Sequence, residues 1–461
     1  MTMPNPLRVA VVGSGPAAFF TAEPLLSQSG LAVSVDMFER LPAPFGLVRF
    51  GVAPDHQKIK SVTRTFEKVA GRPGFRFFGN VDVGTHVTLD DLRRHYHAIC
   101  FATGAQTDRR LGIPGEDLAR SHPATEFVAW YNGHPEFRNR TFDLSGRRAA
   151  VIGVGNVAVD VVRLLCRTAA ELATTDIAPY AEAALTSSGI REVYLLGRRG
   201  PVQAAFTNAE VRELGDLAGA DIVVPPRDCA LDPISAAELA ASDDRALAKK
   251  VEILKEFSTR ARAGKPRTLT LRFLVSPVEF LGDEAGGVRG IRLARNRLEA
   301  DGHGGTRAVA TDEVEDLPVD LVFRSVGYRG VPLPGVPFDE RHGTVPHRQG
   351  RVLDGDTVVP GLYVSGWIKR GPSGVIGTNK PDAAETVASI LADAAAGALP
   401  VPVAPDPASA AALVRERQPR VVAFADWARI DAAETARGKA CGRPRIKCTT
   451  VEEFLAAAER R

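Results

Sequence analysis

The chain has 461 residues, enough for two or three domains, and its 58 basic and 55 acidic side chains leave a net charge of +3. Its apolar content of 44% and charged content of 25% are ordinary for a globular protein. A charge so near neutrality creates no chain-wide field that would attract nucleic acid or an anionic membrane. Neither is therefore expected as a partner, and no segment is apolar for long enough to span a bilayer.

A glycine-rich loop follows the first apolar run of the sequence. Residues 9–12 (VAVV) have the β-branched character of a buried parallel strand, and a helical apolar pattern follows the loop at 13–18 (GSGPAA). In such a fingerprint Gly13 makes the turn, Gly15 admits a pyrophosphate and Ala18 lets the helix pack on the strand. The helix N-terminus then offers unpaired N–H groups and a partial positive charge to the phosphates.

The next apolar run, residues 33–39, ends in Glu39, about twenty residues beyond the loop, where a ribose-binding acid is expected. A carboxylate there can accept hydrogen bonds from both ribose hydroxyls and would repel a 2′-phosphate. The first site is therefore predicted to hold FAD or NAD rather than NADP. Further strands are predicted at 75–83 and 97–104, followed by a connector with several loops at 109–145.

A second fingerprint of the same form begins with the strand 149–152 (AAVI) and the loop 153–158 (GVGNVA). Its ribose position differs, because the following strand ends in Gly197, and Arg198 and Arg199 come next. Two guanidinium groups match phosphate oxygens, which favours NADP(H) over NAD(H). The alternative is a surface arginine pair without a cofactor. Each loop is followed, at its expected ribose position, by a residue type that suits a particular nucleotide. This pattern favours two different nucleotides and a chain that passes electrons between them.

The rest of the chain is predicted to alternate helices and strands. Helical stretches are expected near 164–184 and 235–262, a hairpin turn at 282–287, strands at 321–328 and 360–367, a helix near 382–395, an alanine- and proline-rich linker at 396–412, and a helical C-terminal segment.

The five cysteines are scattered along the chain. Cys100, Cys166, Cys229, Cys441 and Cys448 form no C-x-x-C and no cluster with histidines at metal spacing. This argues against a disulfide reductase, a metal site and a built-in iron–sulfur cluster. Reduced thiols, together with a first strand that leaves no room for a signal peptide, predict a cytoplasmic protein.

At the level of its motifs the chain resembles the ferredoxin–NADP reductases of the adrenodoxin reductase type. The resemblance rests on both glycine loops and on the following stretches, which keep the order of that family: 44–56 (PFGLVRFGVAPDH), 197–201 (GRRGP) and 366–380 (GWIKRGPSGVIGTNK). The first and last of these stretches are much more specific than a glycine loop.

The resemblance implies an α/β fold with two Rossmann-like dinucleotide-binding domains, in which an NADP domain is inserted in an FAD domain. The FAD domain would comprise residues 1–108 and 326–461, the latter with a C-terminal extension, and the NADP domain residues 109–325. The implied activity is that of an NADPH-dependent FAD oxidoreductase, a ferredoxin–NADP(+) reductase, which takes a hydride from NADPH and passes single electrons to a ferredoxin.

The same resemblance assigns site residues. FAD contacts fall on the first glycine loop, on Glu39 and on later positions: Gly13, Gly15, Ala17, Glu39, Leu47, Val83, Trp367, Gly374, Val375 and Ile376. NADP contacts fall on Arg109, Gly153, Gly155, Asn156, Val157, Arg198, Arg199, Glu210 and Gly374. His56 and Glu213 are placed beside the reacting rings as catalytic residues. Residues 374–376 are expected to begin a helix whose N–H groups face the flavin.

Several of these residues have a plainer interpretation. A lone loop histidine such as His56 is more often structural, and only its motif favours a role at the flavin. Glu210 and Glu213 are spaced to share one helix face, which also suits a solvated helix. Trp367 could simply be a packed aromatic at a strand end.

Other functions also fit two nucleotide sites. A flavoprotein oxidase or monooxygenase acting on a small molecule is the main alternative, and a non-enzymatic nucleotide sensor is another.

Overall fold

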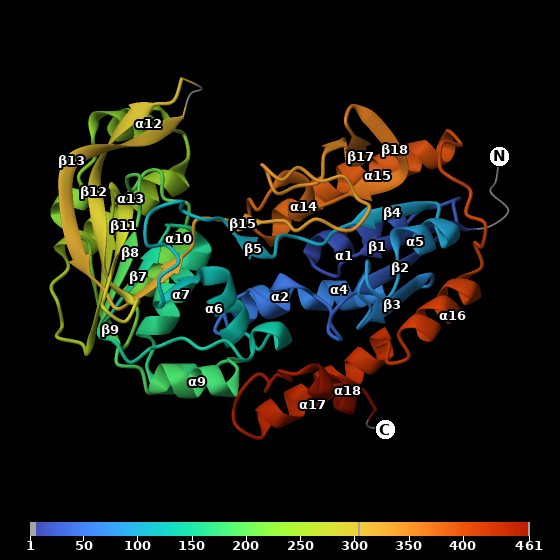
Figure 1. Ribbon diagram of the computed structural model, residues 1–461, viewed down its shortest axis with the longest axis horizontal. Coiled ribbons are helices and arrows are strands. Elements are labelled where there is room, and N and C mark those ends of the chain that lie inside the picture. The colour runs from blue at the N-terminus through green and yellow to red at the C-terminus, as the bar shows by residue number, and fades with distance from the viewer. Residues whose placement is uncertain (1–5, 303–304, 460–461) are drawn as a thin grey trace. The chain divides into compact units, whose positions relative to one another are not determined.

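The computed structural model describes residues 6–302 and 305–459. The chain divides into two compact units. The first comprises Met1–Thr107, Asn132–Arg138 and Gly327–Arg461, and the second comprises Asp108–Tyr131 and Asn139–Val326. In Figure 1 the first unit carries mainly the blue and the orange-to-red elements, and the second mainly the cyan-to-yellow ones. The first unit is therefore built from three separate pieces of the sequence.

The first unit is centred on a seven-stranded sheet. Across the sheet the strands are β16 (His347–Arg348), β17 (Arg351–Asp354), β18 (Thr357–Val364), β4 (Ala98–Phe101), β1 (Leu7–Val12), β2 (Val33–Glu39) and β3 (Phe75–Gly79). The five strands from β18 to β3 are parallel, and β16 and β17 add antiparallel strands at one edge. Strand β1 is buried along its whole length, as its continuous apolar run predicts.

Alternate residues of β1 enter two different buried clusters. Leu7, Val9 and Val11 belong to one, and Ala10 and Val12 to the other. Successive side chains of a strand point to opposite faces, so the sheet is covered on both sides. The helices that provide this cover and the connections are α1 (Pro16–Leu25), α2 (Leu47–Phe50), α3 (Gln57–Lys60), α4 (Thr63–Ala70), α5 (Leu89–His95), η1 (Pro135–Phe137), α14 (Trp367–Arg370), η2 (Ile376–Thr378), α15 (Asn379–Ala395), α16 (Pro407–Arg417), α17 (Phe424–Lys439) and α18 (Val451–Glu459).

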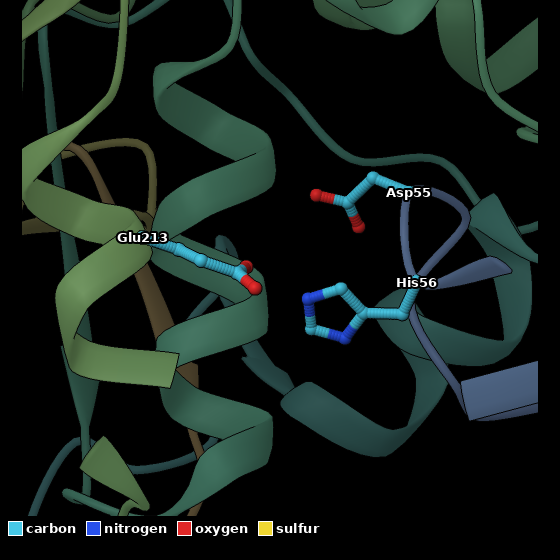
Figure 2. Close-up of side chains that lie close together, drawn as sticks. All are labelled: Asp55, His56 and Glu213. Carbon is cyan, nitrogen blue, oxygen red and sulfur yellow. The ribbon is translucent and has the colours of Figure 1, made fainter. Parts of the chain in front are cut away.

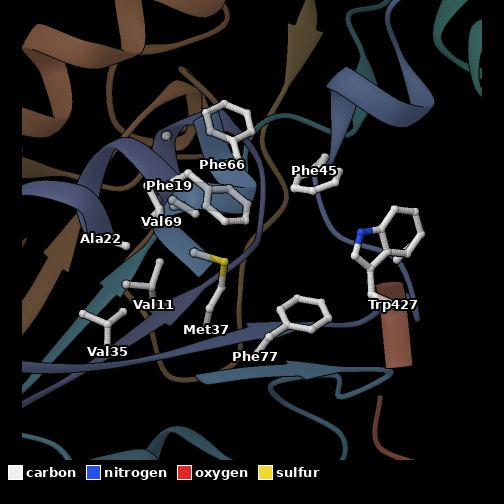
Figure 3. Packing of buried hydrophobic residues seen from close by; sticks show 14 of the residues in the cluster. Val11, Phe19, Ala22, Val35, Met37, Phe45, Phe66, Val69, Phe77 and Trp427 are labelled. Carbon is white, nitrogen blue, oxygen red and sulfur yellow. The ribbon is translucent and has the colours of Figure 1, made fainter. Parts of the chain in front are cut away.

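Aromatic side chains from distant parts of the sequence meet in the core of the first unit (Figure 3). Phe19 stacks on Phe66 with ring centroids 4.8 Å apart, and Phe45 and Trp427 meet in a T-shaped arrangement with ring centroids 5.7 Å apart. Trp427 lies on α17, so the C-terminal helices form part of the core of this unit.

The second unit has a six-stranded, wholly parallel sheet. Its order is β6 (Ser121–Pro123), β14 (Leu321–Arg324), β7 (Arg148–Ile152), β8 (Glu192–Leu196), β10 (Arg267–Arg272) and β9 (Ala220–Val223). A separate antiparallel sheet contains β11 (Val275–Gly282), β12 (Val288–Ala300) and β13 (Thr306–Pro318). Two further short strands, β5 (Thr107–Asp108) and β15 (Tyr328–Arg329), pair with each other.

The helices of the second unit follow its parallel strands. They are α6 (Ala124–Tyr131), α7 (Asn156–Cys166), α8 (Ala169–Leu172), α9 (Pro179–Thr186), α10 (Asn208–Gly215), α11 (Pro226–Cys229), α12 (Pro233–Ala241) and α13 (Arg245–Thr259). One sheet is wholly parallel and the other has five parallel strands, and each contains a strand–glycine-loop–helix unit. These features confirm the predicted α/β fold with two Rossmann-like units, one inserted in the other. No described helix has the length and apolar character needed to cross a membrane.

Two helical expectations need correction. The helical stretch near 235–262 is two helices, because Asp244 begins a new one by accepting a hydrogen bond from the N–H of Ala246. The helix expected from Gly374 begins later, with the 3₁₀ turn at Ile376 and then α15. Gly374 has a φ of +78°, which is incompatible with a right-handed helix.

The second glycine loop allows a direct test of the fold. Gly153 has a φ of +125°, and a Cβ there would lie 2.1 Å from the carbonyl oxygen of Ser325, whereas a Cβ on Gly155 would meet no atom within 4 Å. We expect Gly153→Ala to lower the free energy of unfolding by about 1–3 kcal/mol through backbone strain alone, while Gly155→Ala stays near the wild type. Urea unfolding of both variants without nucleotide measures this. Equal midpoints for Gly153→Ala and wild type would contradict it.

Candidate functional site

The first glycine loop is closed on its strand side and open on its helix side. The N–H of Gly13 donates to the carbonyl oxygen of Phe38 at 2.8 Å, and a Cβ on Gly13 would lie 2.5 Å from the carbonyl oxygen of Ala102. Gly15 stands at the N-cap of α1, and no atom lies within 4 Å of the place where its Cβ would be. The loop therefore leaves room for a pyrophosphate at the positive end of α1, so the residues present fit a dinucleotide.

Glu39 lies at the end of β2, next to this loop. Its carboxylate accepts a hydrogen bond from the hydroxyl of Ser14 at 2.6 Å and one from the N–H of Leu41 at 3.0 Å. Burial raises the pKa of Glu39, although both hydrogen bonds oppose that rise. The carboxylate is thus tied to the glycine loop itself, at the place where sequence spacing puts a ribose.

A third segment, the loop at residues 45–56, reaches the same glycine loop. The N–H of Phe45 donates to the carbonyl oxygen of Ser14 at 3.0 Å, and a Cβ on Gly46 would lie 3.0 Å from the Cα of Gly15. Leu47 then begins α2.

The same loop carries His56 at its end. His56 is buried, follows Asp55 directly and begins α3 as its N-cap (Figure 2). Val83 is half-buried in a separate loop, where it bridges to Val87 and packs against a buried cluster of the first unit.

Trp367 lies near the first glycine loop because the preceding residue, Gly366, packs against Ala17. A Cβ on Gly366 would lie 2.5 Å from the Cβ of Ala17, and the N–H of Gly366 donates to the carboxylate of Asp382 at 2.5 Å. The indole N–H of Trp367 donates to the carbonyl oxygen of Ser373 at 3.1 Å, which joins Trp367 to the Gly374–Ile376 stretch.

Within that stretch Val375 is exposed and Ile376 begins η2. The first unit therefore brings Gly13, Gly15, Ala17, Glu39, Leu47 and Trp367 around one loop.

In the second unit the start of α7 is joined to the start of α10. Gly155 is the N-cap of α7, and Asn156 and Val157 are the first residues of the helix. The side-chain oxygen of Asn156 accepts from the N–H of Thr207 at 2.9 Å, and Thr207 caps α10 by accepting from the N–H of Glu210. The open space at Gly155 repeats the geometry of Gly15 and fits a second pyrophosphate.

Arg198 and Arg199 follow β8 with their main chain held in place. Their carbonyl oxygens accept from the side chain of Asn296 at 2.7 Å and from the N–H of Leu274 at 3.2 Å. Among the described residues, neither guanidinium group has a protein hydrogen-bond or ion-pair partner, so both groups are available for a phosphate. Arg109, predicted for the same cofactor, has an exposed side chain just after β5.

A buried arginine pairs with three acidic residues of the second unit. Arg163 on α7 has no exposed side-chain surface and lies 2.7 Å from Asp160, 3.1 Å from Glu210 and 3.4 Å from Glu213. Figure 2 shows Glu213 on α10. Glu210 and Glu213 are therefore not merely a solvated helix face.

Sequence reasoning missed Asp160 and Arg163. The signal was present as two charged residues three positions apart in the otherwise apolar helix NVAVDVVRLLC. The two predicted catalytic residues belong to different units, His56 to the first and Glu213 to the second.

Several known proteins are similar to this chain over nearly its whole length. NADPH-ferredoxin reductase FprA of Mycobacterium tuberculosis is 49% identical over 459 residues, which span 98% of this chain and 99% of that protein. Mitochondrial NADPH:adrenodoxin oxidoreductase of Arabidopsis thaliana is 43% identical over 466 residues, with 98% and 96% covered. None of the compared family models matches.

A solved structure shares the fold in full. The structure of Mycobacterium tuberculosis FprA in complex with NADPH superposes with a TM-score of 0.93 at 47% identity, covering 98% of this chain and all of that one.

We expect the double variant Arg198→Ala/Arg199→Ala to lose affinity for NADPH and to retain affinity for NADH, because only NADPH carries a 2′-phosphate. The loss should be tenfold or more, since one charge-assisted hydrogen bond contributes about 1.5–3 kcal/mol. Titration of both nucleotides measures it. Arg191→Ala, before β8, is the control, because its guanidinium donates to neighbouring carbonyl oxygens. Equal weakening of NADPH and NADH would contradict the assignment.

Proposed function

Since the chain belongs to the NADPH–ferredoxin reductases of the adrenodoxin reductase type, we propose that it oxidises NADPH through FAD and delivers single electrons to a ferredoxin. The observation that carries this proposal is the contrast between its two glycine loops. One is followed by a carboxylate at the end of β2, and the other by two guanidinium groups after β8 that have no hydrogen-bond or ion-pair partner in the described part of the chain. One loop suits a nucleotide without a 2′-phosphate and the other suits one with it.

The first unit would hold the FAD. Gly13, Gly15 and Ala17 would receive the pyrophosphate at the N-terminus of α1, and Glu39 would accept hydrogen bonds from the ribose. Leu47 and Val83, together with Trp367 and the Gly374–Ile376 stretch, would enclose the rest of the molecule. FAD supplies the conversion between a two-electron donor and a one-electron acceptor.

The second unit would hold the NADPH. The loop at Gly153 and Gly155, with Asn156 and Val157, would bind the pyrophosphate, and Arg198 and Arg199 the 2′-phosphate. Arg109, Glu210 and Gly374 are further proposed contacts. Open space at Gly155 supports this placement.

The domain assignment follows from these sites. We assign residues 1–108 and 326–461 to the FAD domain and 109–325 to the NADP domain. Within the latter range, Asn132–Arg138 belongs to the first compact unit. Cytoplasm is the proposed location.

His56 and Glu213 are the proposed catalytic residues. His56 ends the loop that starts against Gly15, so its position is coupled to the FAD loop. Glu213 is paired with Arg163 on α7, the helix that begins at the NADP loop. Each side chain is thereby connected to one nucleotide loop and is proposed to border the reacting ring of that nucleotide. Hydride transfer needs no acid or base, so their roles would be to orient groups and to manage the proton taken up on reduction.

One experiment tests the proposed function. NADPH is added to the purified yellow protein without oxygen, and loss of the flavin absorbance is followed. Cytochrome c reduction is then measured with and without candidate ferredoxins. We expect rapid bleaching and ferredoxin-dependent cytochrome reduction. Oxygen consumption that requires a small-molecule substrate, with no stimulation by ferredoxin, would instead indicate an oxidase or monooxygenase.

We expect His56→Gln to retain FAD and NADPH binding and to slow turnover by about tenfold, the effect of losing roughly 1.4 kcal/mol of transition-state stabilisation. Pre-steady-state bleaching and steady-state rates measure it. His86→Gln is the control, because His86 lies in the first unit and its ring bonds to the N–H of Asp82 and to Gln418. An unchanged rate for His56→Gln would remove His56 from the site.

A further inference from the structure

A buried ion pair joins α2 to the C-terminal segment, defined here as residues 424–459. The guanidinium of Arg49 donates two hydrogen bonds to the carboxylate of Glu434 on α17, at 2.9 and 2.6 Å. Arg49 is 6% exposed and Glu434 has no exposed surface. Taking both charges out of water is costly, and the two parallel hydrogen bonds between them offset part of that cost.

The C-terminal segment also contacts the main chain of Arg49. The ammonium group of Lys447, which is also buried, donates to the main-chain carbonyl of Arg49 at 3.3 Å and to the side chain of Asn132 at 3.0 Å. Arg445 donates to Glu434 at 3.2 Å, and so does the N–H of Cys448 at 2.7 Å.

These contacts keep the carboxylate charged. Burial alone raises the pKa of Glu434, but Arg49 and Arg445 bring that pKa below its ordinary value. The charge that holds Arg49 is therefore present at neutral pH.

Aromatic rings complete the enclosure of Arg49. Its guanidinium lies 5.0 Å from the ring of Trp427, 5.1 Å from Phe50 and 5.2 Å from Phe454. Trp427 in turn meets Phe45, the residue that bonds to the first glycine loop (Figure 3). The C-terminal segment thus touches the 45–56 loop both through charge and through packing.

The position of helix α2 depends on contacts with other segments. It has four residues, which is too short to be stable without outside contacts. It follows Gly46 directly, and Gly46 is packed against Gly15 of the glycine loop. Any shift of α2 would therefore move the wall of the site beside Gly15.

We propose that Glu434 and Lys447 are positioning residues for FAD. By holding the side chain and the carbonyl of Arg49, they keep α2 and Gly46 against the glycine loop, and the C-terminal segment thereby sets how tightly FAD is retained. This inference rests on the proposed function only in that the first unit is taken as the FAD site.

Three variants of the full-length holoenzyme test this role. Arg49→Lys keeps the charge but cannot form two parallel hydrogen bonds. Lys447→Met removes the hydrogen bond to the carbonyl oxygen of Arg49. The double variant Arg49→Met/Glu434→Met removes both charges of the ion pair together, so that neither is left buried and unpaired. Asp393→Asn is the matched control, because Asp393 accepts two hydrogen bonds of 2.8 Å from the guanidinium of Arg351. Its described side-chain partners, Arg351 and Tyr363, lie outside the 45–56 loop.

Each protein is heated while flavin fluorescence reports FAD release and far-ultraviolet circular dichroism reports unfolding. We expect FAD to leave the three variants well below their unfolding midpoints and, at room temperature, at least tenfold faster than from the wild type. In Asp393→Asn the two transitions should stay together.

If release and unfolding shift together in all three variants, the contacts are merely structural and the proposal is overturned. A wild-type protein that binds FAD but passes no electrons to ferredoxin would contradict the proposed function and would leave this measurement intact.

Discussion

The first unit depends on close approach of main chains around a single loop. Gly13 lies against the carbonyl of Ala102, Gly46 lies against Gly15, and Gly366 lies against Ala17. At each of these contacts a side chain on the glycine would lie within about 3 Å of a neighbouring atom. Three segments from distant parts of the sequence can therefore meet at the strand–helix turn. At Gly15, at the N-terminus of α1, open space remains, because no described atom lies within 4 Å of the place where its Cβ would be.

Buried arginines organise the surroundings of each glycine loop. In the second unit Arg163 pairs with Asp160 of its own helix α7 and with Glu210 and Glu213 of α10. In the first unit Arg49 ties α2 to Glu434. Because a buried guanidinium must be paired, each of these residues fixes the distance between two elements as well as their charge. Of the helices joined in this way, α2 begins with Leu47, α7 begins with Asn156 and Val157, and α10 carries Glu210, all of which are predicted cofactor contacts.

Arg198 and Arg199 illustrate the opposite arrangement. Their carbonyls are bound within the protein, while their charged ends have no partner among the described residues. A cation without a protein partner costs little at the surface and gains a great deal from a phosphate. The difference between paired and unpaired arginines separates groups that shape the protein from groups that are available to a ligand.

Local sequence by itself determined the two fingerprints, Glu39 after the first and the arginine pair after the second. In each fingerprint a strand, a glycine turn and a helix are contiguous, and the next strand of the unit ends at the ribose position. That position lies about twenty residues beyond the first loop and about forty residues beyond the second. The motif around His56 and the stretch from Trp367 to Ile376 also came from sequence, but only by resemblance.

Only the tertiary structure decided what surrounds these motifs. Glu434 lies 385 residues from Arg49, Lys447 lies 398 residues from Arg49 and 315 from Asn132, and Glu210 lies 47 residues from Arg163. Residues Asn132–Arg138, in the connector, join the first unit. No periodicity or spacing encodes such pairs, because each charged residue has many possible partners in the sequence, and packing selects the one that satisfies it away from water.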